Sequence, residues 1–107
     1  YKKAYDYTFI AAQEHQNPIA MNNLGAMYIN GMYVNTDYKI AYDWLLKGYE
    51  KGDHNSTYLL GELYNLGLGV QKDYNKASSL FEKSAQIGNH RAMCALGKLN
   101  KSFNIIT

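Results

Sequence analysis

The spacing of apolar residues along the chain predicts short helices separated by glycine-containing loops. In the stretch LGELYNLGLGVQKDYNKA, residues 60–77, apolar side chains recur at helical spacing up to Leu66 and then give way to glycines. Residues 24–41 read LGAMYINGMYVNTDYKIA and repeat the same order of apolar, glycine, aspartate and tyrosine positions. Apolar residues at this spacing indicate a helix that buries one face. Each stretch is therefore predicted to run from one helix, through a glycine loop, into a second helix.

The two stretches belong to an internal repeat with a period of 36 residues, and the dipeptide Leu96-Gly97 begins a third copy. A period of about 20–50 residues is typical of stacked helical or sheet units. We call the first helix of each unit an A helix and the second a B helix. The segment YKKAYDYTFIAA aligns with YKIAYDWLLKGY of residues 38–49 at an offset of 37, so it reads as an orphan B helix. The predicted A helices cover 18–30, 54–66 and 90–101, and the predicted B helices cover 2–14, 38–51 and 74–87.

Residues that suit helix ends mark the boundaries of these units. Asn17, Asp53 and Asn89 precede the A helices, and Asp37 and Asp73 precede the two complete B helices. Their side chains can accept hydrogen bonds from the unpaired amides of a first helical turn. Glycines suit the left-handed conformation that often ends a helix. The glycines in such positions are Gly31, Gly52, Gly67 and Gly88.

Three glycines lie inside predicted A helices, where glycine costs about 1 kcal/mol relative to alanine. Gly25, Gly61 and Gly97 each follow the apolar leucine of their helix. We interpret them as sites where a neighbouring helix approaches the bare backbone closely. Ala41 and Ala77 of the following B helices are the predicted small partners.

The loop between the two helices of a unit requires a residue with positive φ. Gly69 can supply it, because glycine adopts such conformations without steric cost. Its counterpart one unit earlier is Tyr33. The first loop is therefore expected to follow a different path or to carry backbone strain.

These residues resemble the Sel1-like repeat family, whose repeats are related to tetratricopeptide repeats. The family pattern is close to A-x-x-L-G-x-x-Y-x-x-G-x-G-V-x-x-D-x-x-K-A, and both stretches follow it. A period of 36 residues, rather than about 34, separates the sequence from tetratricopeptide repeats. The resemblance implies an all-α fold, a right-handed solenoid of stacked helix-turn-helix repeats.

We expect one array over residues 1–107, with full repeats at 20–55 and 56–91. A partial repeat at 1–19 holds a B helix alone, and a partial repeat at 92–107 holds an A helix and a degenerate cap. A longer array or a homodimer would cover the orphan first helix. Folding back of Phe103, Ile105 and Ile106 would cover the other end.

Composition narrows the classes of function. The chain is 47% hydrophobic, so it can bury a core, and its net charge is +2 with the lysines spread along it. That distribution does not favour a nucleic-acid partner, which requires a concentrated basic surface. A single cysteine excludes an internal disulfide, and no membrane span or signal pattern is visible. These features favour the cytoplasm.

No cofactor, metal or catalytic site is predicted, so we do not expect an enzyme. His54 and His90 share a repeat position, but no further ligands lie at the short spacing of a metal site. Cys94 has no histidine and acid assigned to it, and we expect its thiol to pack on a helix face. The loop GLGVQKD, residues 67–73, lacks the pattern of a phosphate-binding loop.

The remaining candidate site is the face of the A helices that is not used for packing. In tetratricopeptide-like solenoids the A helices line a concave surface that binds partners. By that resemblance, the exposed positions lie two residues before the core leucine, two after it, and five or six after it. They are Asn22, Ala26, Ile29, Asn30, Tyr58, Glu62, Asn65, Leu66, Cys94, Lys98, Lys101 and Ser102.

The resemblance implies a non-catalytic scaffold or adaptor that binds a protein or peptide on this concave face. The alternative is a regulatory or interaction segment of a larger multidomain enzyme or of a secreted effector. The full-length gene would distinguish the two, because a catalytic domain would appear beside the array.

Overall fold

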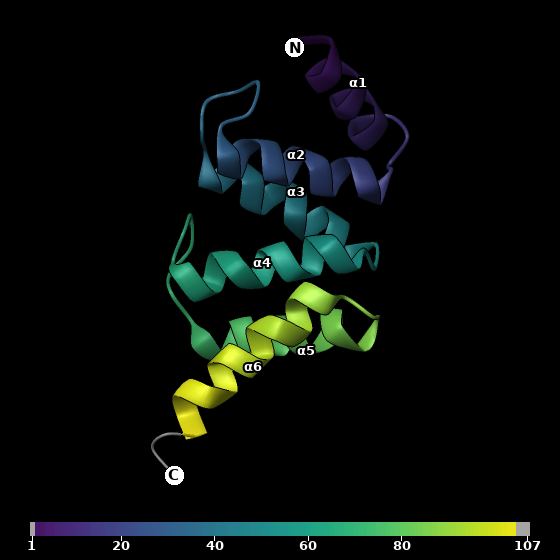
Figure 1. The fold of residues 1–107 in the computed structure, drawn as a ribbon. Helices are drawn as coiled ribbons and strands as arrows, with labels where there is room; N and C mark the ends of the chain where they lie inside the picture. The colour runs from purple at the N-terminus through teal and green to yellow at the C-terminus, as the bar shows by residue number, and fades with distance from the viewer. Residues whose placement is uncertain (1, 105–107) are drawn as a thin grey trace.

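The computed structural model describes the backbone of residues 2–104 and the side chains of residues 3–98. Over that part of the chain the structure consists of six helices joined by short loops, without strands (Figure 1). In chain order the helices are α1 (Lys2–Gln13), α2 (Pro18–Asn30), α3 (Tyr38–Glu50), α4 (His54–Leu66), α5 (Tyr74–Gln86) and α6 (His90–Asn104). The predicted B helices are α1, α3 and α5, and the predicted A helices are α2, α4 and α6.

The helices stack in chain order into an elongated array. Within a repeat α2 packs on α3 and α4 packs on α5, while α3 also contacts α4 and so joins the two repeats. The array measures 51 × 26 × 19 Å, with α1 at one end and α6 at the other (Figure 1). The predicted all-α solenoid is confirmed. The predicted cap of Phe103, Ile105 and Ile106 lies outside the described side chains.

The side chains of all five predicted N-cap residues accept hydrogen bonds from the first turns of their helices. The Asp53 Oδ2 atom accepts from the Ser56 amide at 2.8 Å, and the Asn89 Oδ1 atom accepts from the Ala92 amide at 2.9 Å. These bonds satisfy amides that have no partner within the helix. The predicted left-handed glycines also have positive φ, namely Gly31, Gly52, Gly67 and Gly88.

The glycines inside the A helices are covered by large side chains, not by the predicted alanines. A Cβ atom on Gly61 would lie 2.7 Å from Phe81 Cε1, and one on Gly25 would collide with Leu45. Both partners lie one helical turn beyond Ala41 and Ala77, which are buried but are not the nearest side chains. The predicted close approach is therefore confirmed for these two glycines, and the predicted identity of the partner is wrong.

Gly97 differs from the other two glycines, because no atom of the described residues lies within 4 Å of the position of its Cβ atom. The prediction of a close neighbour at this position is wrong for the described chain. The reason is topological, since Leu45 and Phe81 come from the B helix that follows each A helix. No helix follows α6 in the described residues.

The loop between α2 and α3 follows the same path as the loop between α4 and α5, and it carries backbone strain at Tyr33. Tyr33 has a φ of 68°, close to the 73° of Gly69 in the equivalent position. A left-handed conformation costs about 1–2 kcal/mol for a residue with a side chain. The expectation of strain is thus confirmed.

Tyrosine pairs tie two of the B helices, α1 and α3, to the A helix of the next repeat. The hydroxyls of Tyr5 in α1 and Tyr28 in α2 are 2.8 Å apart, and those of Tyr42 in α3 and Tyr64 in α4 are 3.0 Å apart. In both pairs the rings meet edge to face. The two contacts occupy equivalent positions of the repeat. Tyr5 in α1 therefore corresponds to Tyr42 in α3.

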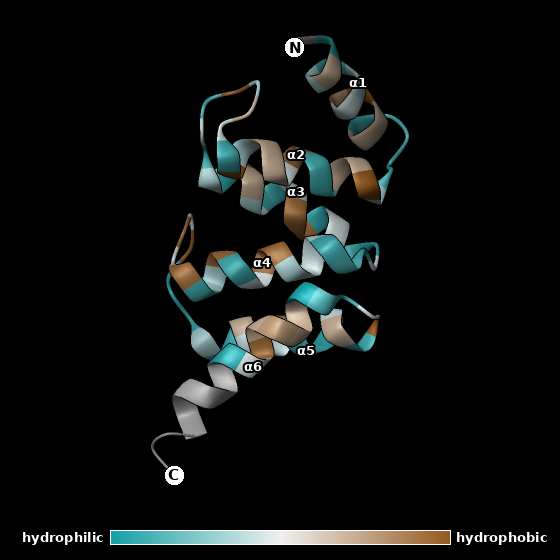
Figure 2. Cartoon of the chain, viewed as in Figure 1, coloured by the Kyte–Doolittle hydropathy of each residue, from teal (hydrophilic) through white to brown (hydrophobic). Residues whose placement is uncertain are grey.

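Apolar and polar residues are interspersed along the helices, as expected of helices that each bury one face (Figure 2). The fully buried residues of largest volume include Phe81, Met21 and Leu24. In the described chain, none of the helices has the length and apolar character that crossing a membrane requires.

Candidate functional site

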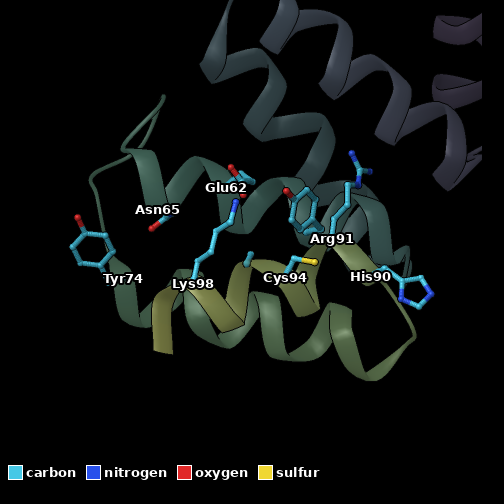
Figure 3. A pocket seen from close by; sticks show the side chains of 9 residues that line it. Glu62, Asn65, Tyr74, His90, Arg91, Cys94 and Lys98 are labelled. Atoms are coloured by element: carbon cyan, nitrogen blue, oxygen red, sulfur yellow. The ribbon is translucent and has the colours of Figure 1, made fainter. Parts of the chain in front are cut away.

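Two hollows lie along the face formed by the A helices. The α2–α4 hollow has a volume of about 330 Å³, and its walls include Ala26, Ile29 and Leu66. The α4–α6 hollow has a volume of about 690 Å³, and its walls include Asn65 and Lys98 (Figure 3). Tyr58, Glu62 and Arg91 line both hollows and therefore join them into one surface.

Ten of the predicted partner-binding residues have described side chains, and all ten line one hollow or the other. The α2–α4 hollow is lined by Asn22, Ala26, Ile29, Asn30 and Leu66. The α4–α6 hollow is lined by Asn65, Cys94 and Lys98. Tyr58 and Glu62 line both hollows. The side chains of Lys101 and Ser102 lie outside the described residues. The structure thus places the predicted residues together, while their role in binding stays a prediction.

Tyr58 and Arg91 form the centre of this surface. The Arg91 guanidinium lies 4.9 Å from the centroid of the Tyr58 ring, a cation–π distance. The Tyr58 ring also contacts the Phe81 ring, with the ring centroids 5.7 Å apart. Burial raises the pKa of the Tyr58 hydroxyl, and the neighbouring Glu62 carboxylate raises it further, against the opposing charge of Arg91. The hydroxyl is therefore neutral at physiological pH.

Arg91 was missed by the sequence analysis, although it is the only arginine in the chain. The predicted positions were counted from the core leucine of each A helix, and Arg91 lies in the first turn of α6, outside that count. The length of the side chain brings its charge back to α4, where it donates to Asn55 Oδ1 at 3.4 Å. The sequence did contain a signal, because the charged Arg91 stands where the previous repeat has the neutral Asn55.

His54 takes part in the junction between the repeats. The Asn89 amide donates to His54 Nδ1 and to Asn55 Oδ1, both at 3.0 Å, so Nδ1 is unprotonated. The His54 carbonyl oxygen accepts from Ser84 Oγ at 2.7 Å. His54 therefore has a structural role at the junction between repeats. Its position at a helix start in the sequence did not predict that role.

The other candidate groups do not form a reactive cluster in the described part of the chain. His90 lines the α4–α6 hollow, but its ring points outward, away from the Cys94 sulfur (Figure 3). Cys94 is exposed in the hollow, so the expectation that its thiol packs on a helix face is wrong. His15 is exposed after α1. Among the described residues, no three histidine, cysteine or acidic side chains gather as metal ligands would.

Asn22 contributes an unusual polar atom to the α2–α4 hollow. Its Oδ1 atom is buried and has no hydrogen-bond partner. An unpaired buried acceptor costs about 1–3 kcal/mol. A donor brought by a bound molecule would reduce that cost once the amide turned toward it.

Comparison with known proteins identifies the family. The Sel1 repeat family model matches residues 18–53 and 54–89. No curated protein is similar enough to the sequence to count as a match. Among solved structures, the chain is similar to a Sel1 repeat protein from Oxalobacter formigenes, with 34% identity, a TM-score of 0.81, and coverage of 90% of this chain and 39% of the other.

Two further structures have the same fold. Cysteine rich protein B from Helicobacter pylori is 29% identical with a TM-score of 0.80, and the match covers 89% of this chain and 71% of that one. A protective antigen of uropathogenic Escherichia coli, c5321, is 34% identical with a TM-score of 0.81, and the match covers 90% of this chain and 20% of that one. The chain therefore spans less than half the length of two of these three proteins. With two consecutive repeat matches and these structural neighbours, the chain belongs to the Sel1 repeat family.

Proposed function

We propose that this chain is an interaction module that binds an extended segment of another protein along its A-helix face. Members of the Sel1 repeat family are generally protein–protein interaction modules. The observation that carries the proposal is that the two hollows adjoin along the A-helix face and share Tyr58, Glu62 and Arg91. A row of adjoining hollows of this kind fits a peptide chain better than a compact small molecule.

The chemistry of the groove changes along its length. The α2–α4 hollow is lined mainly by apolar side chains and by asparagine amides, which suit apolar side chains and the backbone of an extended peptide. Glu62 and Arg91 lie where the two hollows adjoin, and the α4–α6 hollow adds the charge of Lys98 and the polar side chains of Asn65 and His90. We therefore propose a ligand with apolar residues at one end and polar or charged residues at the other.

The test requires a substitution that changes the groove without disturbing the fold. Tyr58 is unsuitable, because its ring packs on Phe81 in the core. Leu66 is 55% exposed and lines the α2–α4 hollow, so Leu66→Lys places a charge in the groove at little cost to stability. Ile87, 56% exposed at the end of α5 and not in either hollow, is the matched control as Ile87→Lys.

Linear peptides would be selected from a random library on the wild-type chain, and their affinities measured for both variants. We expect Leu66→Lys to weaken binding by at least about tenfold, the loss of one well-buried apolar contact, and Ile87→Lys to bind as wild type does. Equal binding by Leu66→Lys, or a failure to select any peptide, would contradict a groove on the A-helix face. The alternative role as a segment of a larger enzyme or effector stays a prediction.

A further inference from the structure

A third hollow lies between the B helices α3 and α5, with one wall from α4. This α3–α5 hollow has a volume of about 230 Å³ and shares no residue with the two hollows of the A-helix face. Its walls combine leucines, tyrosines, a serine and two lysines. Helix α3 packs against α2 and α4, and α5 packs against α4 and α6, so the hollow lies inside the array and not at either end (Figure 1).

The equivalent place between α1 and α3 holds aromatic rings of the chain itself. Trp44 stands there where α5 has Leu80, and Phe9 stands where α3 has Leu46. The two rings meet edge to face with their centroids 5.9 Å apart, and Trp44 is only 9% exposed. Leucine is smaller than either ring. The α3–α5 hollow therefore offers room where the preceding junction of the repeat holds a tryptophan.

A lysine accompanies both places. The Lys47 ammonium lies 4.6 Å from the centroid of the Trp44 ring. Lys83 occupies the equivalent position of α5 and lines the α3–α5 hollow, where its ammonium donates to the Tyr49 hydroxyl at 2.8 Å. A ring bound in the hollow would meet Lys83 as Trp44 meets Lys47. Tryptophan is the aromatic side chain that attracts a cation most strongly.

The charge of the hollow is positive. Lys76, two helical turns before Lys83 on α5, also lines it and lies 5.3 Å from the centroid of the Tyr64 ring. The equivalent residue of α3 is the uncharged Ile40. None of the residues that line the hollow is acidic, and the structure describes all of them. The walls therefore complement a negatively charged ligand.

Hydroxyl groups supply the remaining polar contacts. The Tyr42 and Tyr64 hydroxyls are 3.0 Å apart and form one hydrogen bond, so one of the two hydrogens stays available to a ligand. That bond and burial raise the pKa of Tyr42, which keeps its hydroxyl neutral at physiological pH. A buried indole N–H requires an acceptor, and the exposed Ser79 hydroxyl in the wall can accept.

We infer that the α3–α5 hollow binds a tryptophan side chain of a partner protein, with acidic residues beside that tryptophan in the partner's sequence. The indole packs on Leu46, Leu60 and Leu80, and the flanking carboxylates meet Lys76 and Lys83. The inference does not depend on what the A-helix face binds, because the two sites have no residue in common.

The probe is a five-residue peptide, acetylated and amidated, with a central tryptophan between pairs of glutamates. Binding would be followed by the amide signals in nuclear magnetic resonance spectra of the wild-type chain. We expect a Kd of about 0.1–1 mM, as one anchoring side chain provides, with the signal changes concentrated in α3 and α5. Replacing the tryptophan by alanine should weaken binding at least about tenfold, and replacing the glutamates by glutamines about threefold or more.

Two variants test the walls of the hollow. Leu80→Trp supplies a ring from the chain itself, at a position where α3 accommodates one, and should weaken peptide binding at least about tenfold. Lys76→Gln combined with Lys83→Gln removes the positive charge and should weaken binding by about three- to tenfold. Lys3→Gln combined with Lys39→Gln removes two exposed charges elsewhere and should bind as wild type does.

Four results would overturn the inference. The peptide could cause no signal change in α3 and α5 up to about 5 mM, well above the expected Kd. The changes could fall on the A-helix face instead. The alanine peptide could bind as well as the tryptophan peptide. Finally, binding could be equal in the two double lysine variants, or unaffected by Leu80→Trp when circular dichroism shows that variant to be folded.

Discussion

Single glycines set how closely the helices of a repeat approach each other. Gly25 and Gly61 occupy equivalent positions, and each lies under a large side chain of the following B helix. At both positions the space that a side chain would occupy is already filled by the core. The same residue type at Gly97 has no such neighbour among the described residues, which allows the packing role to be tested within one chain.

We predict that Gly61→Leu lowers the free energy of unfolding by about 3 kcal/mol or more, because the new side chain would overpack against Phe81. Gly97→Leu is the matched control. It meets no described atom and is expected to leave stability unchanged or raise it by about 1 kcal/mol through helix propensity. Urea denaturation of dilute protein measures both values. Equal effects of the two substitutions would show that the close contact at Gly61 is unimportant.

The hydroxyl of Tyr5 gives a second prediction at this scale. Burial and the hydrogen bond to Tyr28 raise the pKa of Tyr5 to about 12, from an ordinary value of 10. The neutral form is therefore favoured in the folded state, and its contribution is complete below pH 10 and lost as the pH rises to about 12.

Tyr5→Phe is expected to lower the free energy of unfolding by about 1 kcal/mol at neutral pH, the usual value of one hydrogen bond. That difference from wild type should shrink as the pH rises above 10, because the wild-type chain then loses the same contribution. Denaturation at several pH values provides the measurement. A difference that stays constant up to about pH 12 would mean that Tyr5 does not titrate in this way.

At the scale of the element, the helix boundaries follow from residues that act locally. The A helices α2 and α4 have the predicted bounds, α1, α3 and α5 end one residue earlier than predicted, and α6 ends three residues later. This agreement was possible because N-caps and left-handed glycines act on their own turn of helix. The loop at Tyr33 is the exception, because there the repeat imposes a conformation that the residue itself disfavours.

We predict that Tyr33→Gly is more stable than Tyr33→Ala by about 1 kcal/mol. Both variants lose the same side chain beyond Cβ, so their difference isolates the cost of a positive φ for a residue with a Cβ atom. Thermal or urea denaturation of the two variants is sufficient. Since glycine is ordinarily the less stable of the two, a more stable Tyr33→Ala would show that this loop carries no strain.

At the scale of the whole molecule, stability depends on how many neighbours each helix has. The central helices α3 and α4 pack against helices on both sides, whereas α1 and α6 lie at the ends of the described array (Figure 1). Repeat arrays are stabilised mainly by contacts between nearest neighbours.

Hydrogen exchange of dilute protein should therefore protect the amides of α3 and α4 most, and those of α1 and α6 least. Uniform protection over all six helices would mean that the array unfolds as one cooperative unit without weaker ends.

The sequence by itself determined the repeat and most of the helix boundaries, and its resemblance to tetratricopeptide-like repeats indicated the row of A-helix residues that line the hollows. The repeat and the boundaries depend on period, caps and helical spacing, which are local properties of the chain. Only the tertiary structure decided that Leu45 and Phe81 cover the glycines, that Arg91 lies over Tyr58, and that Gly97 is open. These contacts depend on the direction and length of side chains from neighbouring helices and on which helices are present, and a repeat period specifies neither.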